Sequence, residues 1–288
     1  MTPPASIPPL DRTGSEAGVV SLRAVITGAS SGIGRQIAMT LGSRFPGSKA
    51  EPSRFLVHFR RNESGAREVV ESLRELGCQA SSIAADLTQP ADRTRLIEAA
   101  WSAVGTPTTW VNNAGADVLT GQAAEWSFET KLQTLLETDV IGTIALSRDV
   151  ATRLREDQRA GSTAEPPSMT FIGWDQAPLG MEGEAGQMFG PVKAAVMAFA
   201  NSFAQEHSPH LRVNTVAPGW IKTAWGEETK GYWDRRAKQQ SLMNRWGRPS
   251  DVASAVAFAA DPNNTFCTGQ TLNVNGGWNR TVPRSPQE

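Results

Sequence analysis

The stretch VITGASSGIG, residues 25–34, joins a short apolar run to the start of an amphipathic segment and contains three glycines in a TGxxxGxG spacing. Glycines at such a junction let the backbone turn tightly against a pyrophosphate, whose charge is stabilised by the N–H groups and dipole of a helix N-terminus. The spacing therefore predicts a strand, a dinucleotide-binding loop and a helix, with an ordinary glycine-rich turn as the alternative. The expected cofactor-binding residues of this loop are Gly28, Ser30, Ser31, Gly32, Ile33 and Gly34.

Strand-like and helix-like segments alternate outward from this loop over most of the chain. The expected strands are LRAVITG, RFLVHF, QASSIAADL, TTWVNNAG, SMTFIG, LRVNTVAPG and QTLNVN. Helical spacing of apolar residues follows at 35–45, 65–77, 90–103, 125–157, 188–207 and 249–260. This alternation predicts one doubly wound (Rossmann) α/β domain, with a mostly parallel seven-stranded sheet and helices on both faces. The domain is expected over residues 21–280, preceded by a disordered or strap-like arm (1–20) and followed by a tail (281–288).

Composition excludes several classes of function. The 28 basic and 29 acidic residues are interspersed, so neither nucleic acid nor a membrane surface is an expected partner. The two cysteines have no metal-ligand spacing, so no metal site is expected and a reducing compartment is indicated. Apolar runs stay below the ~20 residues that cross a bilayer, and prolines occupy the start, where a signal peptide has its apolar stretch. A cytoplasmic location is expected.

The second expected strand ends in VHFRRN, residues 57–62. A site for NAD(H) usually has an acidic side chain at this point to bind the ribose hydroxyls, whereas this chain has Arg60 and Arg61, followed by Asn62. Guanidinium groups pair with phosphate, so NADPH/NADP+ is favoured over NAD(H). A solvated basic turn is the alternative.

The glycine-rich segment DQAPLGMEGEAGQMFG, residues 175–190, is expected to be a loop for most of its length. It follows the expected strand SMTFIG and therefore lies at the carboxyl edge of the sheet. Ligands of doubly wound sheets bind at that edge.

Several motifs together resemble the short-chain dehydrogenase/reductase family: TGASSGIG, AADL, NNAG, the lysine of FGPVK, RVNTVAPGWIKT and TGQTLNVNGG, over about residues 21–280. The resemblance implies that Asp86 and Leu87 cover the adenine. It implies a small-molecule substrate and assembly as a homodimer or homotetramer. It also assigns Asn113, Ala114 and Gly115 to the ribose side, and Pro218, Gly219, Ile221 and Thr223 to the nicotinamide half.

The expected catalytic positions depart from the family's usual Ser, Tyr, Lys and Asn. Lys193 is present and, by the resemblance, binds the nicotinamide ribose, but the tyrosine position four residues earlier is Phe189. The only tyrosine, Tyr232, lies well past the PGWIKT motif. The asparagine position is Asp139, which is expected to accept a hydrogen bond or order a water.

The serine position falls among Gly173, Trp174 and Asp175, none of which is a serine. Asp175 lies 14 residues before Phe189 and resembles the aspartate that pteridine reductases of this family carry there, although those proteins keep the tyrosine. A carboxyl beside Trp174 could act as an acid with a raised pKa or stabilise a cationic substrate while ionised. A loop-capping role is the alternative.

The missing hydroxyl decides which chemistry is expected. Reduction of a neutral ketone needs a proton donor that typically contributes ~10²–10⁴-fold, whereas an iminium ion accepts hydride alone. The aromatic residues around the expected substrate side favour a flat or cationic ligand, although several could belong to the core. They are Trp174, Phe189, Trp220, Trp225 and Trp233.

Three hypotheses remain open from the sequence. The first is an NADPH-dependent reductase of a C=N, iminium-like or otherwise activated aromatic substrate, with Asp175, Lys193 and Asp139 as catalytic residues. The second is a member that binds NADP(H) without redox chemistry. The third is an ordinary alcohol dehydrogenase that uses Tyr232 from a lid over residues 224–242.

Overall fold

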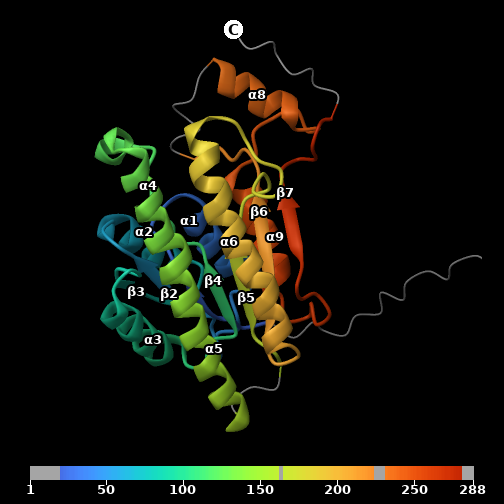
Figure 1. The fold of residues 1–288 in the computed structure, drawn as a ribbon. Coiled ribbons are helices and arrows are strands. Elements are labelled where there is room, and N and C mark those ends of the chain that lie inside the picture. The colour runs from blue at the N-terminus through green and yellow to red at the C-terminus, as the bar shows by residue number, and fades with distance from the viewer. Residues whose placement is uncertain (1–19, 162–164, 224–230, 281–288) are drawn as a thin grey trace, which may run out of the picture.

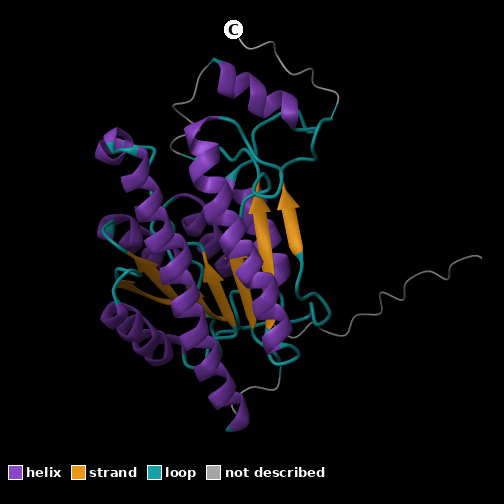
Figure 2. Cartoon of the chain, viewed as in Figure 1, coloured by secondary structure: helices purple, strands orange, loops and turns teal. Residues whose placement is uncertain are grey.

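In a computed structural model of the protein, residues 20–161, 165–223 and 231–280 are described. Seven parallel strands form one sheet in the order β3-β2-β1-β4-β5-β6-β7 (Figures 1 and 2). The strands are β1 (Arg23–Ile26), β2 (Arg54–Phe59), β3 (Gln79–Ala84), β4 (Thr109–Asn112), β5 (Ser168–Ile172), β6 (Arg212–Pro218) and β7 (Thr271–Val274). The predicted seven-stranded doubly wound sheet is confirmed, and every pairing in it is parallel.

Helices cover both faces of the sheet, because the central strands are apolar on both sides. In β1, Ala24 and Ile26 pack into one buried cluster and Val25 packs into the other, as alternation along a strand requires. The first cluster is covered by α1 (Gly32–Arg44), α2 (Glu63–Glu75) and α9 (Pro249–Ala260). The second is covered by α3 (Pro90–Val104), α5 (Thr143–Arg159) and α6 (Gly183–His207).

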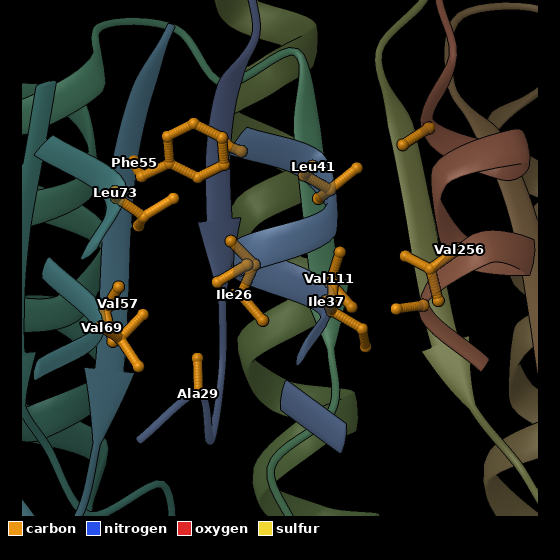
Figure 3. Close-up of a cluster of buried hydrophobic side chains, with 14 of the residues drawn as sticks. Ile26, Ala29, Ile37, Leu41, Phe55, Val57, Val69, Leu73, Val111 and Val256 are labelled. Atoms are coloured by element: carbon orange, nitrogen blue, oxygen red, sulfur yellow. The ribbon is translucent and has the colours of Figure 1, made fainter. Parts of the chain in front are cut away.

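The core beneath the glycine loop joins the strand and the helix on either side of it. Figure 3 shows Ile26 of β1 packed between Val57 and Val69 on one side and Ile37 of α1 on the other. All four side chains have no exposed surface, and burying each one fully stabilises the fold by roughly 1.5–3 kcal/mol. The strand and the helix that flank the loop are therefore fixed relative to one another.

The stretch predicted as one helix over 125–157 contains a distortion. Here α4 (Phe128–Leu135) continues through the π-helical turn η2 (Leu136–Gly142) into α5. Such turns inside helices are frequent at functional sites. A short 3₁₀ turn, η1 (Gly121–Glu125), precedes α4.

Helix α6 begins at Gly183, five residues before the predicted start at 188, so about half of the glycine-rich segment 175–190 is helical. Glycine and Pro191 lower helix propensity, but burial of Met188 and Val192 in the packed core overrides that preference. The remaining part, 175–182, is a loop at the carboxyl edge, as expected.

Beyond the carboxyl ends of β6 and β7 lies α8 (Tyr232–Gln240), which Figure 1 shows above the tips of these strands. Among the helices of the described residues, none combines the length and apolar character needed to cross a membrane. The predicted arm (1–20), apart from Val20, and the predicted tail (281–288) lie outside the described residues.

Candidate functional site

The glycine loop between β1 and α1 leaves no room for side chains at two of its glycines. Gly28 has a φ of +64°, and a Cβ there would lie 2.7 Å from the Ala114 Cα atom. A Cβ on Gly34 would lie 2.3 Å from the Gly28 carbonyl oxygen. Gly32, with a φ of +55°, faces open space. Side chains at 28 and 34 are thus excluded by backbone, and the space in front of Gly32 is free for a ligand.

The N-terminus of α1 fits a phosphate. Its N-cap residue, Ser31, is exposed and makes no capping hydrogen bond, and the first turn contains no acidic residue. N–H groups of a first helical turn lack intrahelical partners and carry the positive end of the helix dipole. This end of the sheet can therefore hold a dinucleotide pyrophosphate, between Ser30 and the partly buried Ile33.

Residues that follow β4 form hydrogen bonds with the start of the glycine loop and fix its backbone. The Thr27 hydroxyl accepts bonds from the Asn113 and Ala114 N–H groups, each 3.0 Å long. The Asn113 side chain donates to the carbonyl oxygens of Thr27 and Gly28, both at 2.9 Å. Asn113, predicted to line the ribose, thus directs its amide at the loop backbone, while Gly115 is exposed.

Two further side chains join the glycine loop to the neighbouring strands. The ring of His58, in β2, lies between the Gly28 N–H group and the Ala85 carbonyl oxygen. Asn62 caps α2 by accepting a bond from Gly65 N at 3.1 Å, and its Nδ2 donates to the Ser30 carbonyl oxygen at 3.4 Å. Asn62 therefore reaches the loop through its amide, whereas His58 was not identified from the sequence.

Arg60 and Arg61 follow β2 directly and are exposed. Within the described residues neither guanidinium group has a hydrogen-bond or ion-pair partner. They lie beside the glycine loop, because Ala29 N donates to the His58 carbonyl oxygen at 2.9 Å. Both cations are available to an anionic ligand in this loop.

The segment after β3 forms the next wall of the same edge. The Asp86 carboxylate accepts bonds from the Thr88 N–H and hydroxyl groups at 3.0 and 2.8 Å. Leu87 is buried, and its carbonyl oxygen accepts a bond from Arg93 at 2.7 Å. These bonds fix Asp86 and Leu87 where the adenine was expected.

Lys193 and Asp139 form an ion pair. The Lys193 Nζ atom lies 3.0 Å from Asp139 Oδ2, and the Asp139 side chain is 3% exposed. The other carboxylate oxygen accepts a bond from Ala116 N at 2.8 Å, and a Cβ on Gly115 would lie 2.8 Å from Oδ2. Asp139 lies in η2 and Lys193 in α6, so the π-helical turn brings a carboxylate to the lysine. The ammonium charge is balanced by a carboxylate of the chain itself.

Asp175 lies in the loop after β5 and is 5% exposed. Its Oδ2 accepts a bond of 2.9 Å from the Asn275 side chain, whereas Oδ1 is buried without a hydrogen-bond partner. Burial raises the pKa of this carboxyl to about 6, against the opposing effect of the Asn275 bond. A Cβ on Gly219 would lie 3.2 Å from Oδ2, and Asp175 N donates to the Pro218 carbonyl oxygen at 3.1 Å. Asp175 therefore contacts the segment expected to hold the nicotinamide half.

Residues 218–223, the segment expected to hold the nicotinamide half, are bonded to the residues that precede α9. Ile221 is buried and forms a bridge to Gly247, and Thr223 N donates to the Ile221 carbonyl oxygen at 2.9 Å. Asp175 and Lys193 share no hydrogen bond among the described residues: the Asp175 side chain bonds to Asn275, and the Lys193 side chain bonds to Asp139.

A family model described as enoyl-(acyl carrier protein) reductase matches residues 28–279. The 3-oxoacyl-[acyl-carrier-protein] reductase FabG of Vibrio cholerae is 32% identical over 260 residues, which cover 88% of this chain and 96% of that protein. The chain belongs to the short-chain dehydrogenase/reductase family. Glucose 1-dehydrogenase 2 of Bacillus subtilis is 28% identical and covers 88% of this chain and 93% of its own length. Family members are NAD(P)-dependent oxidoreductases that act on small molecules.

Solved structures of the short-chain dehydrogenase/reductase family have the same fold. A short-chain dehydrogenase from Burkholderia cenocepacia in complex with NADP superimposes with a TM-score of 0.74 at 24% identity, over 90% of this chain and 98% of that one. A 7α-hydroxysteroid dehydrogenase complexed with NADH and 7-oxo glycochenodeoxycholic acid gives a TM-score of 0.75 at 26% identity, over 90% and 95%.

Phe189, which the resemblance places at the family's tyrosine position, is partly buried and packs against the cluster formed by Val118, Leu135, Met188 and Val192. The Tyr232 hydroxyl donates to Glu182, the residue before α6, at 3.2 Å. No group of three or more metal-binding side chains occurs within the described residues.

An aromatic cluster lies between α8 and the end of β6. The rings of Trp220 and Trp233 are 5.9 Å apart, and Trp220 and Trp246 are 5.8 Å apart. The Arg236 guanidinium carbon lies 5.4 Å from the Trp233 ring centre, and the Arg236 Nη1 atom forms an ion pair with Glu182. Trp220 thus packs against α8, while Trp174 is partly buried and Trp225 lies outside the described residues, as do residues 224–230 of the expected lid.

Proposed function

We propose that the protein transfers hydride from NADPH to a C=N, iminium-like or otherwise activated, aromatic small molecule, with Asp175 in place of the family's serine. The observation that carries the proposal is the buried Asp175 carboxyl, which has one unpaired oxygen and a pKa of about 6. An unpaired carboxylate oxygen in a buried place costs stability unless a ligand or a proton occupies it. Perturbed groups of this kind gather at functional sites.

The choice of NADPH rests on Arg60 and Arg61. Both are exposed beside the glycine loop, and no carboxylate follows β2 at the point where a ribose hydroxyl would need one. Paired guanidinium groups bind a phosphate through charge-assisted hydrogen bonds. NADPH carries such a phosphate on its adenosine ribose, and NADH does not.

The acceptor class follows from the proton balance. NADPH, when bound, would supply a hydride, and addition of that hydride to an iminium ion would give an amine without any proton. A ketone or a neutral imine also needs a proton, and Phe189 has none to give. Lys193 can hold a ribose hydroxyl while its ion pair with Asp139 holds the lysine in place.

Asp175 can serve two acceptors, one in each of its protonation states. Above pH ~6 it is ionised and stabilises a cationic acceptor by its charge. Below pH ~6 its Oδ1–H or Oδ2–H group can give a proton to a neutral C=N nitrogen, and solvent then restores that proton. A kcat/KM that rises with pH through ~6 therefore indicates a cationic acceptor, and one that falls indicates a neutral C=N acceptor.

The test compares wild type with Asp175→Asn on N-methyl dihydroisoquinolinium, a permanently charged aromatic iminium, and on acetophenone, a neutral ketone. With the cation, wild-type kcat/KM should rise through pH ~6, and Asp175→Asn should lower it by at least about 100-fold while NADPH affinity by calorimetry is unchanged. Equal activity of the two proteins on the iminium would refute the role of Asp175. Faster reduction of acetophenone than of the iminium would refute the acceptor class.

A second candidate function is NADP(H) binding without redox chemistry, and the Lys193–Asp139 ion pair favours it. A lysine neutralised by a carboxylate no longer lowers the pKa of a neighbouring hydroxyl, and here the hydroxyl is absent as well. In that case NADPH binds to the protein, but no iminium or ketone is reduced by wild type at any pH.

The organisation proposed with this function is one NADP-binding domain over residues 21–280 in a cytoplasmic homodimer or homotetramer, as is common in the family. The near-zero net charge of −1 supports a small-molecule rather than a polyanionic partner. Sedimentation of the purified protein would give the number of subunits.

A further inference from the structure

His58 is a buried titratable side chain that the proposed chemistry does not use. It is 2% exposed and lies near the end of β2. Its Nδ1 atom is 3.1 Å from Gly28 N, and its Nε2 atom is 3.0 Å from the Ala85 carbonyl oxygen. The ring thus lies between the first glycine of the cofactor loop and the residue that precedes Asp86.

The two partners define one form of the ring. Gly28 N can only donate, so Nδ1 must carry its lone pair, and the Ala85 carbonyl can only accept, so Nε2 must carry the hydrogen. A second proton on the ring would place an Nδ1–H group directly against the Gly28 N–H group. Only the neutral Nε2–H tautomer satisfies both partners.

These partners belong to opposite ends of the cofactor's adenosine half. Gly28 is in the loop that receives the pyrophosphate, and its φ of +64° is a conformation that a fixed N–H direction helps to hold. Ala85 leads into Asp86 and Leu87, the expected adenine wall. Backbone bonds connect the same segments, from Ala29 N to the His58 carbonyl and from Ala85 N to the Phe59 carbonyl, each 2.9 Å long.

We propose that neutral His58 is a positioning residue for the cofactor, which sets the phosphate loop through Gly28 and the adenine wall through Ala85. The proposal rests on the family's use of a nicotinamide dinucleotide and is independent of the acceptor. The bond to Gly28 controls affinity for ligands that contain a pyrophosphate. The bond to Ala85 acts on every ligand that contains the adenosine.

Burial keeps the ring neutral, against the effect of the charges around it. Burial lowers the pKa of His58 to about 4, outweighing the Ala85 bond and the carboxylates of Asp86, after β3, and Asp92, in α3, which raise it. At any pH well above 4 the ring therefore keeps the tautomer that both bonds need.

Two matched variants separate the two bonds. In His58→Asn the amide oxygen takes roughly the place of Nδ1 and can accept from Gly28, but the side chain is too short for Ala85. In His58→Gln the terminal amide takes roughly the place of Nε2 and can donate to Ala85, but Gly28 N loses its acceptor. Calorimetry at neutral pH measures their affinities for NADPH and for adenosine 2′-monophosphate, which lacks the pyrophosphate.

We expect His58→Gln to weaken NADPH binding by about tenfold and to leave the adenosine 2′-monophosphate affinity within about twofold, since the partly buried Gly28 N–H would lose the acceptor that orients the loop, and a lost hydrogen bond has an effect of about that size. His58→Asn should weaken both ligands by the same factor, so that their affinity ratio equals that of wild type. A role in folding alone would lower both thermal stabilities and leave the ratio unchanged in both variants. That result overturns the proposal.

A measurement on wild type does not depend on whether the variants fold. The chain has three histidines, so nitrogen chemical shifts of the labelled imidazoles can be assigned one by one. We expect one ring in the neutral Nε2–H form with no titration between about pH 5 and pH 8. A His58 ring that titrates in this range, or that carries its hydrogen on Nδ1, overturns the proposal. Neither experiment requires turnover, so failure of the proposed reaction leaves both informative.

Discussion

Replacement of Asp175 by asparagine should make the protein more stable, although it removes a proposed catalytic group. The asparagine side chain has the same shape and can still accept the Asn275 hydrogen bond through its amide oxygen. It carries no charge, so it avoids the cost of a buried carboxylate with one unpaired oxygen.

The size of the effect follows from the carboxyl pKa, which is about 6 in the folded protein against an ordinary 3.8. A tenfold change in an acid constant corresponds to ~1.4 kcal/mol, so ionisation of Asp175 costs the folded state about 3 kcal/mol. Because the folded pKa is the higher one, the folded protein binds more protons than the unfolded chain between these two values. The stability that the protonated Asp175 carboxyl contributes to the fold is fully present below pH ~3.8 and is lost as the pH rises through ~6.

Denaturant unfolding of both proteins at about pH 4 and about pH 8 measures this difference. We expect similar free energies of unfolding near pH 4, and a variant that is about 3 kcal/mol more stable near pH 8, equivalent to on the order of 6 °C in Tm. Asn275→Ala serves as the control, since loss of its hydrogen bond should move the titration of Asp175 to higher pH. The reasoning is wrong if the free-energy difference between wild type and Asp175→Asn is the same at both pH values.

Three further outcomes are expected. The double variant Arg60→Asp, Arg61→Ile should weaken NADPH binding by at least about tenfold and NADH binding by less than about twofold in calorimetry, and unchanged NADPH affinity would exclude a phosphate clamp. Phe189→Tyr should leave acetophenone reduction at background, whereas a gain of about 100-fold or more would identify a disabled ketoreductase. Gly34→Ala should abolish NADPH binding and lower Tm, because its Cβ would lie 2.3 Å from the Gly28 carbonyl oxygen; a Cβ accommodated without loss of binding would contradict this geometry.

The fold was predictable because its determinants are local. The run RFLVHF became β2 with the same bounds, and SMTFIG gave β5 apart from its last glycine. The start of α6 was not predictable, because glycines and Pro191 weaken any local indication of a helix and only tertiary packing makes the first turns helical.

Residues of a candidate site could be named from the sequence, but their hydrogen-bond and ion-pair partners could not. Lys193 and Phe189 are named through the family resemblance of the motif FGPVK, whereas the partner of Lys193 lies 54 residues away in the sequence and that of Asp175 lies 100 residues away. Asn275 was visible only as part of the motif TGQTLNVNGG, and His58 only as part of VHFRRN. Their roles depend on strand order, which brings β7 to the loop after β5 and β2 to the glycine loop.

The aromatic cluster of Trp220, Trp233 and Trp246 gives the protein a built-in optical probe. These indoles lie within 6 Å of their neighbours in the cluster, and Trp233 belongs to α8 itself. Any displacement of α8 from the end of β6 therefore changes the surroundings of all three indoles and alters their fluorescence. Indole emission also overlaps the absorption of a reduced nicotinamide, so energy transfer from this cluster can follow cofactor and ligand binding before any substrate has been identified.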